Sequence, residues 1–439
     1  MDLTAWNWEL DGWIVVAGIL CALASSLLGN FLVLRRLSLL GDAISHAVLP
    51  GLAIAFLISD SRSSWAMFVG AAAVGLLTAF FTEWVRGAGK VDEGASMGVV
   101  FTSLFALGLV LIVYTADRVD LDPNCVLFGS IESVPLDTWQ FPGWEIPRAV
   151  VILSGVTLLN LAFVLIFYKE LKLTAFDPDL AKTLGVSPVW MHYGLMCLVA
   201  VTAVACFESV GSVLVVAMLV VPAAAAWMLT DRLGWMMTLS AGLAIVSATT
   251  GHLSAIHVPR WFGYGSTSTS GMIAVMCGVA FLTCALWGPR YGVIIRWIRQ
   301  RNLAWQILSD DILAWLYRQE EKGLISTGPQ LESLPADLHA RPWRIRWSLG
   351  RLKAQGDLEF DATIRLTEKG RDRARVLIRS HRLWERYLMD HADLDQQRLH
   401  DKAEKLEHFT DQEMRAKLHQ EMSAPKQDPH GSEIPNEHP

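Results

Sequence analysis

The chain has 439 residues, of which 52% are hydrophobic and 18% are charged, and its mean hydropathy is +0.35. Because this is more apolar than an average soluble globular protein, the composition argues against a chain dissolved wholly in water. The net charge of -6 excludes a strongly basic nucleic-acid-binding protein, since affinity for phosphate depends on clustered Lys and Arg. Six scattered cysteines without a Cys-x-x-Cys pair indicate packing residues rather than a disulfide framework or a zinc site.

Charge is distributed unevenly along the sequence. Residues 1–300 contain 15 Lys or Arg and 19 Asp or Glu, whereas the shorter remainder contains 22 and 24. We therefore expect a membrane domain over residues 1–299 and a charged soluble tail. The tail divides again, at about residue 370.

Nine apolar segments of roughly bilayer-spanning length occur in the membrane part. They lie at 13–34, 43–59, 63–82, 95–114, 149–168, 189–207, 210–229, 233–250 and 272–287. With the amino terminus outside, eleven Lys or Arg fall on the inner side and four on the outer side, as expected for loops that stay in the cytoplasm. The predicted fold class is an all-α polytopic membrane protein with about nine transmembrane helices and a cytoplasmic carboxyl-terminal tail.

A carboxylate and an imidazole come just before the second apolar segment. In LVLRRLSLLGDAISHAVLPG (32–51), Asp42 and His46 are four residues apart, so a helix presents both on one face. Since ionisable groups are costly in lipid, that face points toward protein or a water-filled path. An oxygen and a nitrogen ligand at this spacing suit a divalent cation. On spacing alone, a buried Asp–His pair at a helix start is the simpler explanation.

This stretch resembles the signature of the permease subunits of ABC importers for zinc, manganese and iron. Similar pieces follow in order at 91–112 (VDEGASMGVVFTSLFALGLVLI), 127–131 (LFGSI), 168–186 (YKELKLTAFDPDLAKTLGV) and 210–229 (VGSVLVVAMLVVPAAAAWML). The resemblance covers nearly all of residues 10–290 and implies that Asp42 and His46 lie on the cation path. Glu208 and His252 have no firm match in the signature; a secondary cation contact and a capping role both stay open, the second being favoured.

A polar segment, FDPDLAKTLG, separates the fifth and sixth apolar segments on the inner side. Its Asp-Pro start predicts a short surface helix, which from the residues alone is equally well an ordinary loop helix. The resemblance implies the coupling helix that docks into an ATPase. Its residues are Phe176, Asp177, Pro178, Asp179, Leu180, Ala181 and Gly185. The sequence lacks a G-x-x-x-x-G-K-[ST] loop, so ATP hydrolysis is expected in a separate subunit and the chain is not expected to be an enzyme.

The start of the tail has helical patterns at 310–319, 328–340 and 341–356, followed by a strand-turn-strand pattern at 357–370. This order is typical of a winged helix-turn-helix. The third helix is basic, with Arg341, Arg344, Arg346, Arg351 and Lys353. Contact with DNA, with lipid headgroups, or with water alone all stay open.

Histidines and glutamates fall at helical spacing further along the tail. His381 and Glu385 are four residues apart, and His400, Glu404, Glu407 and His408 share one helical face. Converging imidazoles and carboxylates can bind a cation, although charged helices form such faces about as readily as stripes of salt bridges.

Residues 306–436 resemble the metal-dependent repressor family that includes the diphtheria toxin repressor and manganese-dependent repressors. The most specific matches are LTEKGRDRARVLIRSHRLWERYL and DPHGSEIP. The resemblance implies that the tail consists of a winged helix-turn-helix-like domain at 300–370 and a helical metal-binding and dimerisation domain with a polar end at 371–439. By position, it implies metal ligands at Asp310, His381, Glu385, His400, Glu404, Glu407 and His408. Leu313 stands where manganese-type members have a second carboxylate, and ARPWRIRW replaces the usual small polar start of the recognition helix. Metal binding is therefore better supported than operator recognition.

Carboxylates and imidazoles without a thiolate suit Mn(II) or Fe(II) better than a soft-ligand zinc site. We expect the permease subunit of a bacterial ABC importer for a divalent transition metal, manganese first with iron and zinc as competitors, in the inner membrane with a cytosolic metal sensor. Expected partners are an ABC ATPase, an extracytoplasmic metal-binding protein, a second permease subunit, identical or different, and membrane lipid. A membrane-anchored, metal-responsive transcription regulator is the main alternative, and an ATP-independent transporter is disfavoured by the coupling-like segment.

Overall fold

The computed structural model describes residues 6–37, 40–59, 64–115, 129, 131–141, 144–323, 334, 338, 340–360, 364–392, 396–422 and 425–436. The chain forms two compact units, which we call unit 1 (Met1–Arg296) and unit 2 (Trp297–Pro439). Their boundary lies a few residues before the predicted end of the membrane domain. Each unit is described by itself.

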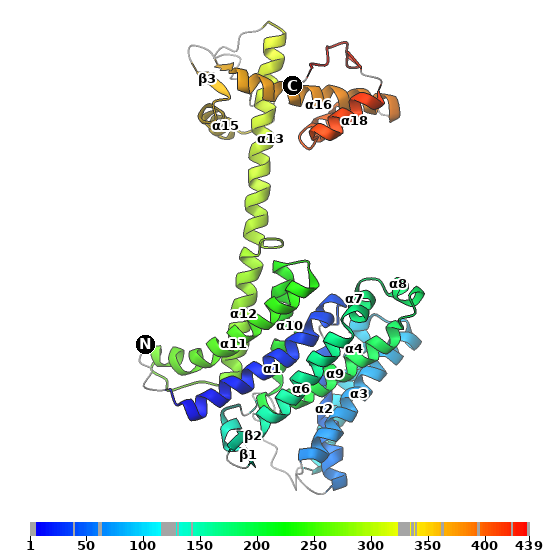
Figure 1. Cartoon of the computed structure of the whole chain (residues 1–439), viewed down its shortest axis with the longest axis vertical. Coiled ribbons are helices and arrows are strands. Elements are labelled where there is room, and N and C mark those ends of the chain that lie inside the picture. The colour runs from blue at the N-terminus through cyan, green and yellow to red at the C-terminus, as the bar shows by residue number, and fades with distance from the viewer. Residues whose placement is uncertain are drawn as a thin grey trace. The chain divides into compact units, whose positions relative to one another are not determined.

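Unit 1 has a long helix at each of the nine predicted segments (Figure 1). These are α1 (Trp8–Leu34), α2 (Leu40–Ser59), α3 (Ser64–Gly89), α4 (Glu93–Thr115), α6 (Arg148–Ile166), α9 (Pro188–Val210), α10 (Ser212–Leu229), α11 (Leu233–Trp261) and α12 (Thr269–Trp287). Among the described residues, eight helices are long and apolar enough to cross a membrane. Helix α2, several of whose side chains are not described, is the ninth of these long helices and is not among the eight. The predicted all-α polytopic fold is confirmed.

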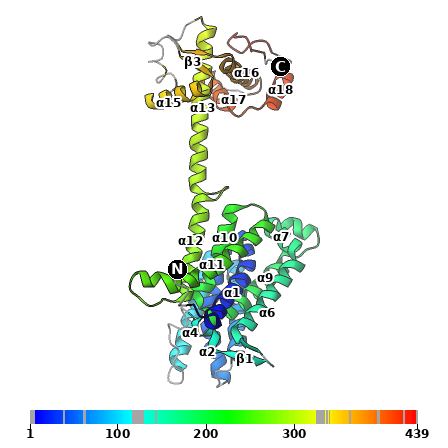
Figure 2. The ribbon, with the colours of Figure 1, turned by 60° about the vertical axis from the view of Figure 1, so that its left-hand side comes forward.

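Helix α1 packs against α6, α9, α10 and α11 in the core of unit 1 (Figures 1 and 2). Gly29 permits the contact with α10, because a Cβ atom at this position would lie 1.8 Å from the carbonyl oxygen of Leu219. Buried amides tie the helices together. The Asn30 side chain donates to Ser240 of α11 at 2.7 Å, and that of Asn160 in α6 donates to Thr202 of α9 at 2.8 Å. Such neutral bonds satisfy polar groups that lipid cannot.

Short elements connect the long helices. The 3-10 helix η2 (Ile131–Leu136) is followed by an antiparallel hairpin of β1 (Thr138–Phe141) and β2 (Trp144–Pro147), in which Thr138 pairs with Pro147. Helices α7 (Tyr168–Phe176) and α8 (Pro178–Thr183) lie between α6 and α9. The predicted surface helix at 176–185 is therefore present as α8, which begins at Pro178 after the cap residue Asp177.

Unit 2 contains most of α13 (Val293–Glu321), followed by α15 (Pro342–Ala354), β3 (Leu358–Phe360), β4 (Ile364–Leu366), α16 (Glu368–His391), α17 (Gln396–Glu407) and α18 (Gln412–Glu421). Strands β3 and β4 form the predicted wing, with Leu358 paired to Leu366. The core of this part contains Leu308, Ile312 and Leu352. The helix predicted at 328–340 falls largely outside the described residues.

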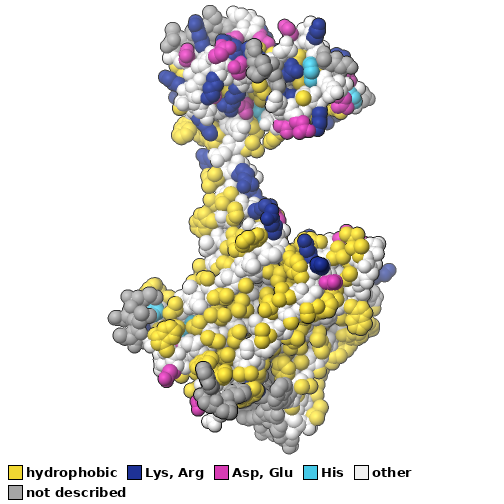
Figure 3. Space-filling view, viewed as in Figure 1, with side chains coloured by type: hydrophobic (Ala, Val, Ile, Leu, Met, Phe, Trp, Pro, Cys, Tyr) yellow, Lys and Arg dark blue, Asp and Glu magenta, His cyan; other side chains and the backbone are white. Residues whose placement is uncertain are grey.

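The surfaces of the two units differ in composition. Hydrophobic side chains cover most of the face of unit 1 that Figure 3 shows, whereas charged side chains of both signs are spread over unit 2. Val110 and Leu165 are among the exposed apolar residues of unit 1, at 67% and 66% exposure. Exposure of this kind along long apolar helices is expected of a surface whose solvent is lipid.

Candidate functional site

The predicted cation path in unit 1 depends on Asp42 and His46, and Glu208 is a less favoured secondary contact. Asp42 and His46 lie in the first two turns of α2, and Glu208 lies near the end of α9. The side chains of all three are outside the described residues. Helix α2 packs against α3, α4, α9 and α10, so its faces are turned toward protein on several sides. The assignment of these three residues to the path stays a prediction.

His252 is buried in α11, where both ring nitrogens have a partner. Nε2 lies 3.1 Å from Asp11 Oδ1 of α1, and Nδ1 lies 3.2 Å from Thr269 Oγ1 at the start of α12. The backbone N–H of Thr269 donates to Glu132 of η2 at 2.7 Å. These contacts connect α1, α11, α12 and η2. The contacts of His252 favour the capping role over the cation contact, which nonetheless stays a prediction.

The predicted coupling residues present an apolar surface around α8. Phe176, Leu180 and Leu184 are 59%, 46% and 64% exposed, whereas Ala181 is fully buried and anchors the helix. The Asp177 carboxylate caps the helix by accepting from the backbone N–H of Leu180 at 2.9 Å, and Asp179 pairs with Lys182 at 3.0 Å. Gly185 ends the segment with φ +80°, a left-handed conformation that favours glycine. Three exposed large side chains around so short a helix are what a docking surface requires.

The tail brings its predicted metal ligands together in two clusters. The first, which we call cluster A, contains His381 and Glu385 of α16 and His400 of α17. Glu385 Oε1 lies 3.1 Å from His381 Nε2 and 2.7 Å from His400 Nδ1. His381 and Glu385 are buried. The i,i+4 spacing places both on the face of α16 that meets α17, as the sequence predicts.

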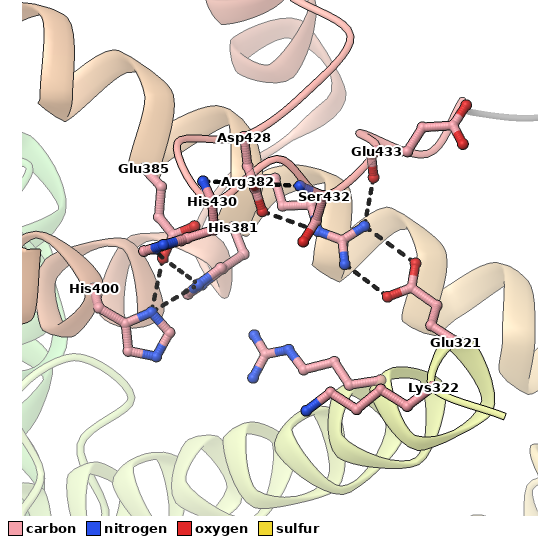
Figure 4. A pocket seen from close by; sticks show the side chains of 11 residues that line it. Glu321, Lys322, His381, Arg382, Glu385, His400, Asp428, His430, Ser432 and Glu433 are labelled. Carbon is pink, nitrogen blue, oxygen red and sulfur yellow. Dashed lines mark hydrogen bonds and ion pairs between the residues drawn. The ribbon is translucent and has the colours of Figure 1, made fainter. Parts of the chain in front are cut away.

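Cluster A forms one wall of a cavity of about 560 Å³. Figure 4 shows its three side chains pointing toward one another, with Lys322, the residue after the end of α13, across the cavity. His430 also lines this cavity, and its Nε2 atom is 4.0 Å from Glu385 Oε1. His430 is not among the predicted ligands, although its position in the DPHGSEIP match was a signal for it.

The second cluster, cluster B, contains Asp311 of α13, Glu407 of α17 and His408. His408 Nε2 lies 3.1 Å from Asp311 Oδ1 and 3.9 Å from Glu407 Oε1. The other oxygen of Glu407 lies 2.5 Å from His381 Nδ1 of cluster A. Glu407 therefore stands between the two clusters and contributes one carboxylate oxygen toward each.

Two predicted ligands, Asp310 and Glu404, are outside both clusters. The carboxylate of Asp310 accepts from Arg373 of α16 at 2.6 Å, and its nearer oxygen is 4.0 Å from His408 Nδ1. Glu404 is exposed on α17. Asp311, which the sequence analysis did not include, takes the place beside His408. The residues alone gave one signal for it, namely a second carboxylate directly after Asp310.

Charge within the clusters shifts the pKa values of the histidines. Burial alone would lower the pKa of His381, but the carboxylates of Glu385 and Glu407 outweigh burial and raise it to about 9. Burial also opposes the charged form of Glu385, yet hydrogen bonds from His381 and His400 bring its pKa well below the usual value. Asp311 similarly raises the pKa of His408 against the effect of burial. Protons on imidazoles thus neutralise the clustered carboxylates.

These residues fit a divalent cation. Each residue of the two clusters offers a carboxylate oxygen or an imidazole nitrogen, and within each cluster these atoms lie within 4.8 Å of one another. A bound cation would replace the imidazole protons as the positive charge. An oxygen and nitrogen set without thiolate suits Mn(II) or Fe(II).

Two known protein families match separate parts of the chain, one within unit 1 and one within unit 2. The ABC 3 transport family matches residues 9–288, and the iron dependent repressor metal binding and dimerisation domain matches residues 367–436.

Two curated relatives and one solved structure are similar to the chain. The manganese transport system membrane protein MntD of Bacillus subtilis (strain 168) is 43% identical over 296 residues, which are 67% of this chain and 98% of the relative. The zinc transport system membrane protein TroD of Treponema pallidum (strain Nichols) is 39% identical over 66% of this chain and 77% of the relative. The structure of PsaBC from Streptococcus pneumoniae in complex with Fab superimposes with a TM-score of 0.54 at 28% identity, covering 68% of this chain and 97% of that one. The family match covers more than half of the sequence and includes all the long helices of unit 1, and the second match includes most of the clustered ligands of the tail. The chain therefore belongs to the ABC 3 transport family and carries an iron-dependent-repressor-type metal-binding domain at its carboxyl end.

Proposed function

We propose that this chain is the permease subunit of an importer that moves Mn(II) into the cytoplasm, and that its tail senses the imported metal. Membership of a transport family supports the import role. Manganese is supported by the relative MntD and by the oxygen and nitrogen ligands of the tail, while the relative TroD keeps zinc as a competitor. Iron competes through the same ligand chemistry.

In this proposal the amino terminus is outside and the tail is cytoplasmic. Asp42 and His46 hold the ion briefly on its path, between an extracytoplasmic metal-binding protein and the cytoplasm. A separate ATPase docks on the exposed apolar residues around α8, such as Leu180. A second permease subunit completes the pore. The positive-inside bias of the loops and the apolar surface around α8 support this arrangement.

The two linked clusters of unit 2 carry the sensor role. They follow the last apolar helix in the chain, so under this orientation they face the compartment that receives the metal. A ligand shifts a conformational equilibrium only through a difference in affinity between two states. Replacing the proton on His381 by a divalent ion changes the charge between α16 and α17. We infer that metal-bound tails, dimerised, hold the transporter in a state of low activity.

Flux into vesicles loaded with graded internal Mn(II) tests the sensor role. The intact chain, assembled with its ATPase, should slow as internal metal rises, whereas a chain truncated after Arg299 should slow less. Glu407→Ala with His408→Ala should behave like the truncation. The matched control replaces Glu413 and Lys417, an exposed pair on α18 that touches neither cluster, and should behave like the intact chain. Identical curves for the intact and truncated chains would refute feedback.

The same experiment separates the transport and regulation parts of the proposal. Absence of Mn(II) flux from every chain, with Zn(II) or Fe(II) transported instead, would overturn the metal assignment alone. Unaltered flux curves together with altered transcription in cells would favour the membrane-anchored regulator.

A further inference from the structure

Tryptophan and arginine side chains gather on one surface of unit 2, away from both metal clusters. Trp297, Arg301 and Trp305 follow one another at four-residue spacing along α13, so they share one helical face. Trp343 and Trp347 of α15, also four apart, continue this surface. We call these five residues, together with Arg344, the tryptophan–arginine face.

The side chains of this face contact one another. The Trp305 ring lies edge-on to Trp343, with centroids 5.9 Å apart, and 6.1 Å from the ring of Trp347. The guanidinium of Arg344 lies over the Trp305 ring at 5.2 Å, and that of Arg301 lies over Trp297 at 5.0 Å. Arg301, Arg344 and the indoles of Trp305 and Trp343 also line a cavity of about 430 Å³. The face is therefore a continuous surface rather than scattered residues.

Packing within unit 2 does not cover this surface. Trp297, Trp343 and Trp347 are 56%, 50% and 72% exposed, and Ile298, the neighbour of Trp297 on α13, is 45% exposed. Figure 3 shows hydrophobic and basic side chains interspersed along the exposed part of α13. Large contiguous apolar surface of this kind indicates a binding partner.

The charge of the surrounding sequence selects an anionic partner. Residues 293–308 contain three arginines and residues 340–356 contain four arginines and a lysine, and neither stretch contains Asp or Glu. Indoles are enriched at the boundary between lipid and water, and each Lys or Arg near an anionic bilayer contributes about 1 kcal/mol of attraction. Trp297 is also close in sequence to Trp287, the last residue of α12. The membrane that unit 1 spans is thus an anionic surface that the chain itself keeps within reach of this face.

Duplex DNA fits the face less well. Base edges in the major groove are read by side chains that make bidentate hydrogen bonds or small apolar contacts. Here the most exposed large apolar side chain on α15 is the indole of Trp347, a bulky group with a single N–H donor. We propose that the tryptophan–arginine face binds the anionic phospholipid headgroups of the membrane that unit 1 spans.

A fluorophore on α15 tests this in the full chain reconstituted into bilayers. Gly350 lies seven residues after Trp343 and three after Trp347, on the same helical face, and a Cβ atom there would meet nothing within 4 Å. Gly350→Cys therefore provides a labelling site, and Ala416→Cys on the exposed surface of α18 provides the matched reference. The chain without an introduced cysteine measures stray labelling of the native thiols.

Quenching by nitroxide-headgroup lipid is then compared in phosphatidylcholine bilayers with and without phosphatidylglycerol. We expect several-fold stronger quenching at position 350 than at 416 when phosphatidylglycerol is present, and its loss in high salt and in Arg301→Gln with Arg344→Gln. Trp343→Ser with Trp347→Ser should also lose it, while circular dichroism shows an unchanged melting curve. Equal quenching at both positions, quenching indifferent to phosphatidylglycerol, a signal that responds to duplex DNA instead, or self-quenching that grows with protein density would each overturn the proposal.

Discussion

Buried polar groups are satisfied by different chemistry in the two units. In unit 1 the described buried amides bond to neutral partners, as Asn30 does to Ser240 and Asn160 to Thr202. In unit 2 buried polar groups are largely ionic, as where Arg373 joins Asp310 to Asp357. An unpaired charge in lipid costs far more free energy than an unpaired amide, so breaking a neutral hydrogen bond between membrane helices costs less than breaking an ion pair. Unit 2 can hold ions because water is its solvent.

This difference makes the exceptions in each unit informative. Within unit 1, the ionisable pair of Asp42 and His46 departs from the neutral pattern at the start of α2. Within unit 2, His408 Nδ1 is one of several buried side-chain atoms without a hydrogen-bond partner among the described residues. Asp42, His46 and His408 are all residues predicted to bind a metal ion.

The largest expected effect comes from removing the ionisable exception of unit 1. Asp42→Ala or His46→Ala should reduce metal uptake to background, because each removes a ligand from the path, while membrane insertion and ATPase association remain. Radioactive Mn(II) uptake into cells, with immunoblotting for insertion, measures this. Glu145→Ala, an exposed carboxylate of β2, is the matched control and should transport normally. Normal transport by both variants would remove these residues from the path.

The next effect concerns the exposed apolar surface around α8. Leu180→Asp should weaken ATPase association about tenfold or more, since a charge replaces an apolar contact at a docking surface. Co-purification of the ATPase from detergent extracts reports association. Lys182→Ala removes only an exposed ion pair from the same helix and should associate normally. If Leu180→Asp retained the ATPase, the docking surface would lie elsewhere.

Close helix packing in unit 1 gives a third prediction. Gly29→Ala places a methyl group against the Leu219 carbonyl and should destabilise the membrane domain by about 1–3 kcal/mol or more, because α1 and α10 must separate. Gly278→Ala, where a Cβ atom meets nothing within 4 Å, is the matched control. Thermal unfolding in detergent compares the two variants. Equal melting temperatures would show that α1 and α10 are less closely packed than described.

The smallest expected effect is a pH dependence confined to unit 2. The pKa of His381 is raised from 6.5 to about 9, so its contribution to stability without metal is complete below pH 6.5 and is lost as pH rises through about 9. A metal ion must displace this proton, so apparent Mn(II) affinity should rise about tenfold per pH unit for each proton released. Metal titration of the full chain at several pH values measures this, with Glu407→Ala and His408→Ala as background. An affinity independent of pH would mean that metal does not displace the His381 proton.

Hydropathy and helical spacing predict much of this molecule because they reflect local requirements. Lipid demands long apolar helices, so the segments that became α1 to α12 stand out from the sequence, and i,i+4 spacing pairs His381 with Glu385. The ion pair between Asp310 and Arg373 joins residues 63 positions apart, and no local sequence pattern predicts it. Nor could spacing show that Glu404 is exposed while Glu407, three residues later, lies between two clusters.

The carboxylate of Glu407 couples the two clusters of unit 2. One of its oxygens lies toward His381 and the other toward His408. An ion bound by one oxygen therefore reduces the negative charge that the carboxylate offers to the other cluster. Two binding events that share a ligand cannot be independent, so the metal affinity of one cluster should depend on whether the other cluster is occupied. The range of cytosolic metal concentrations over which the tail responds would then depend on Glu407.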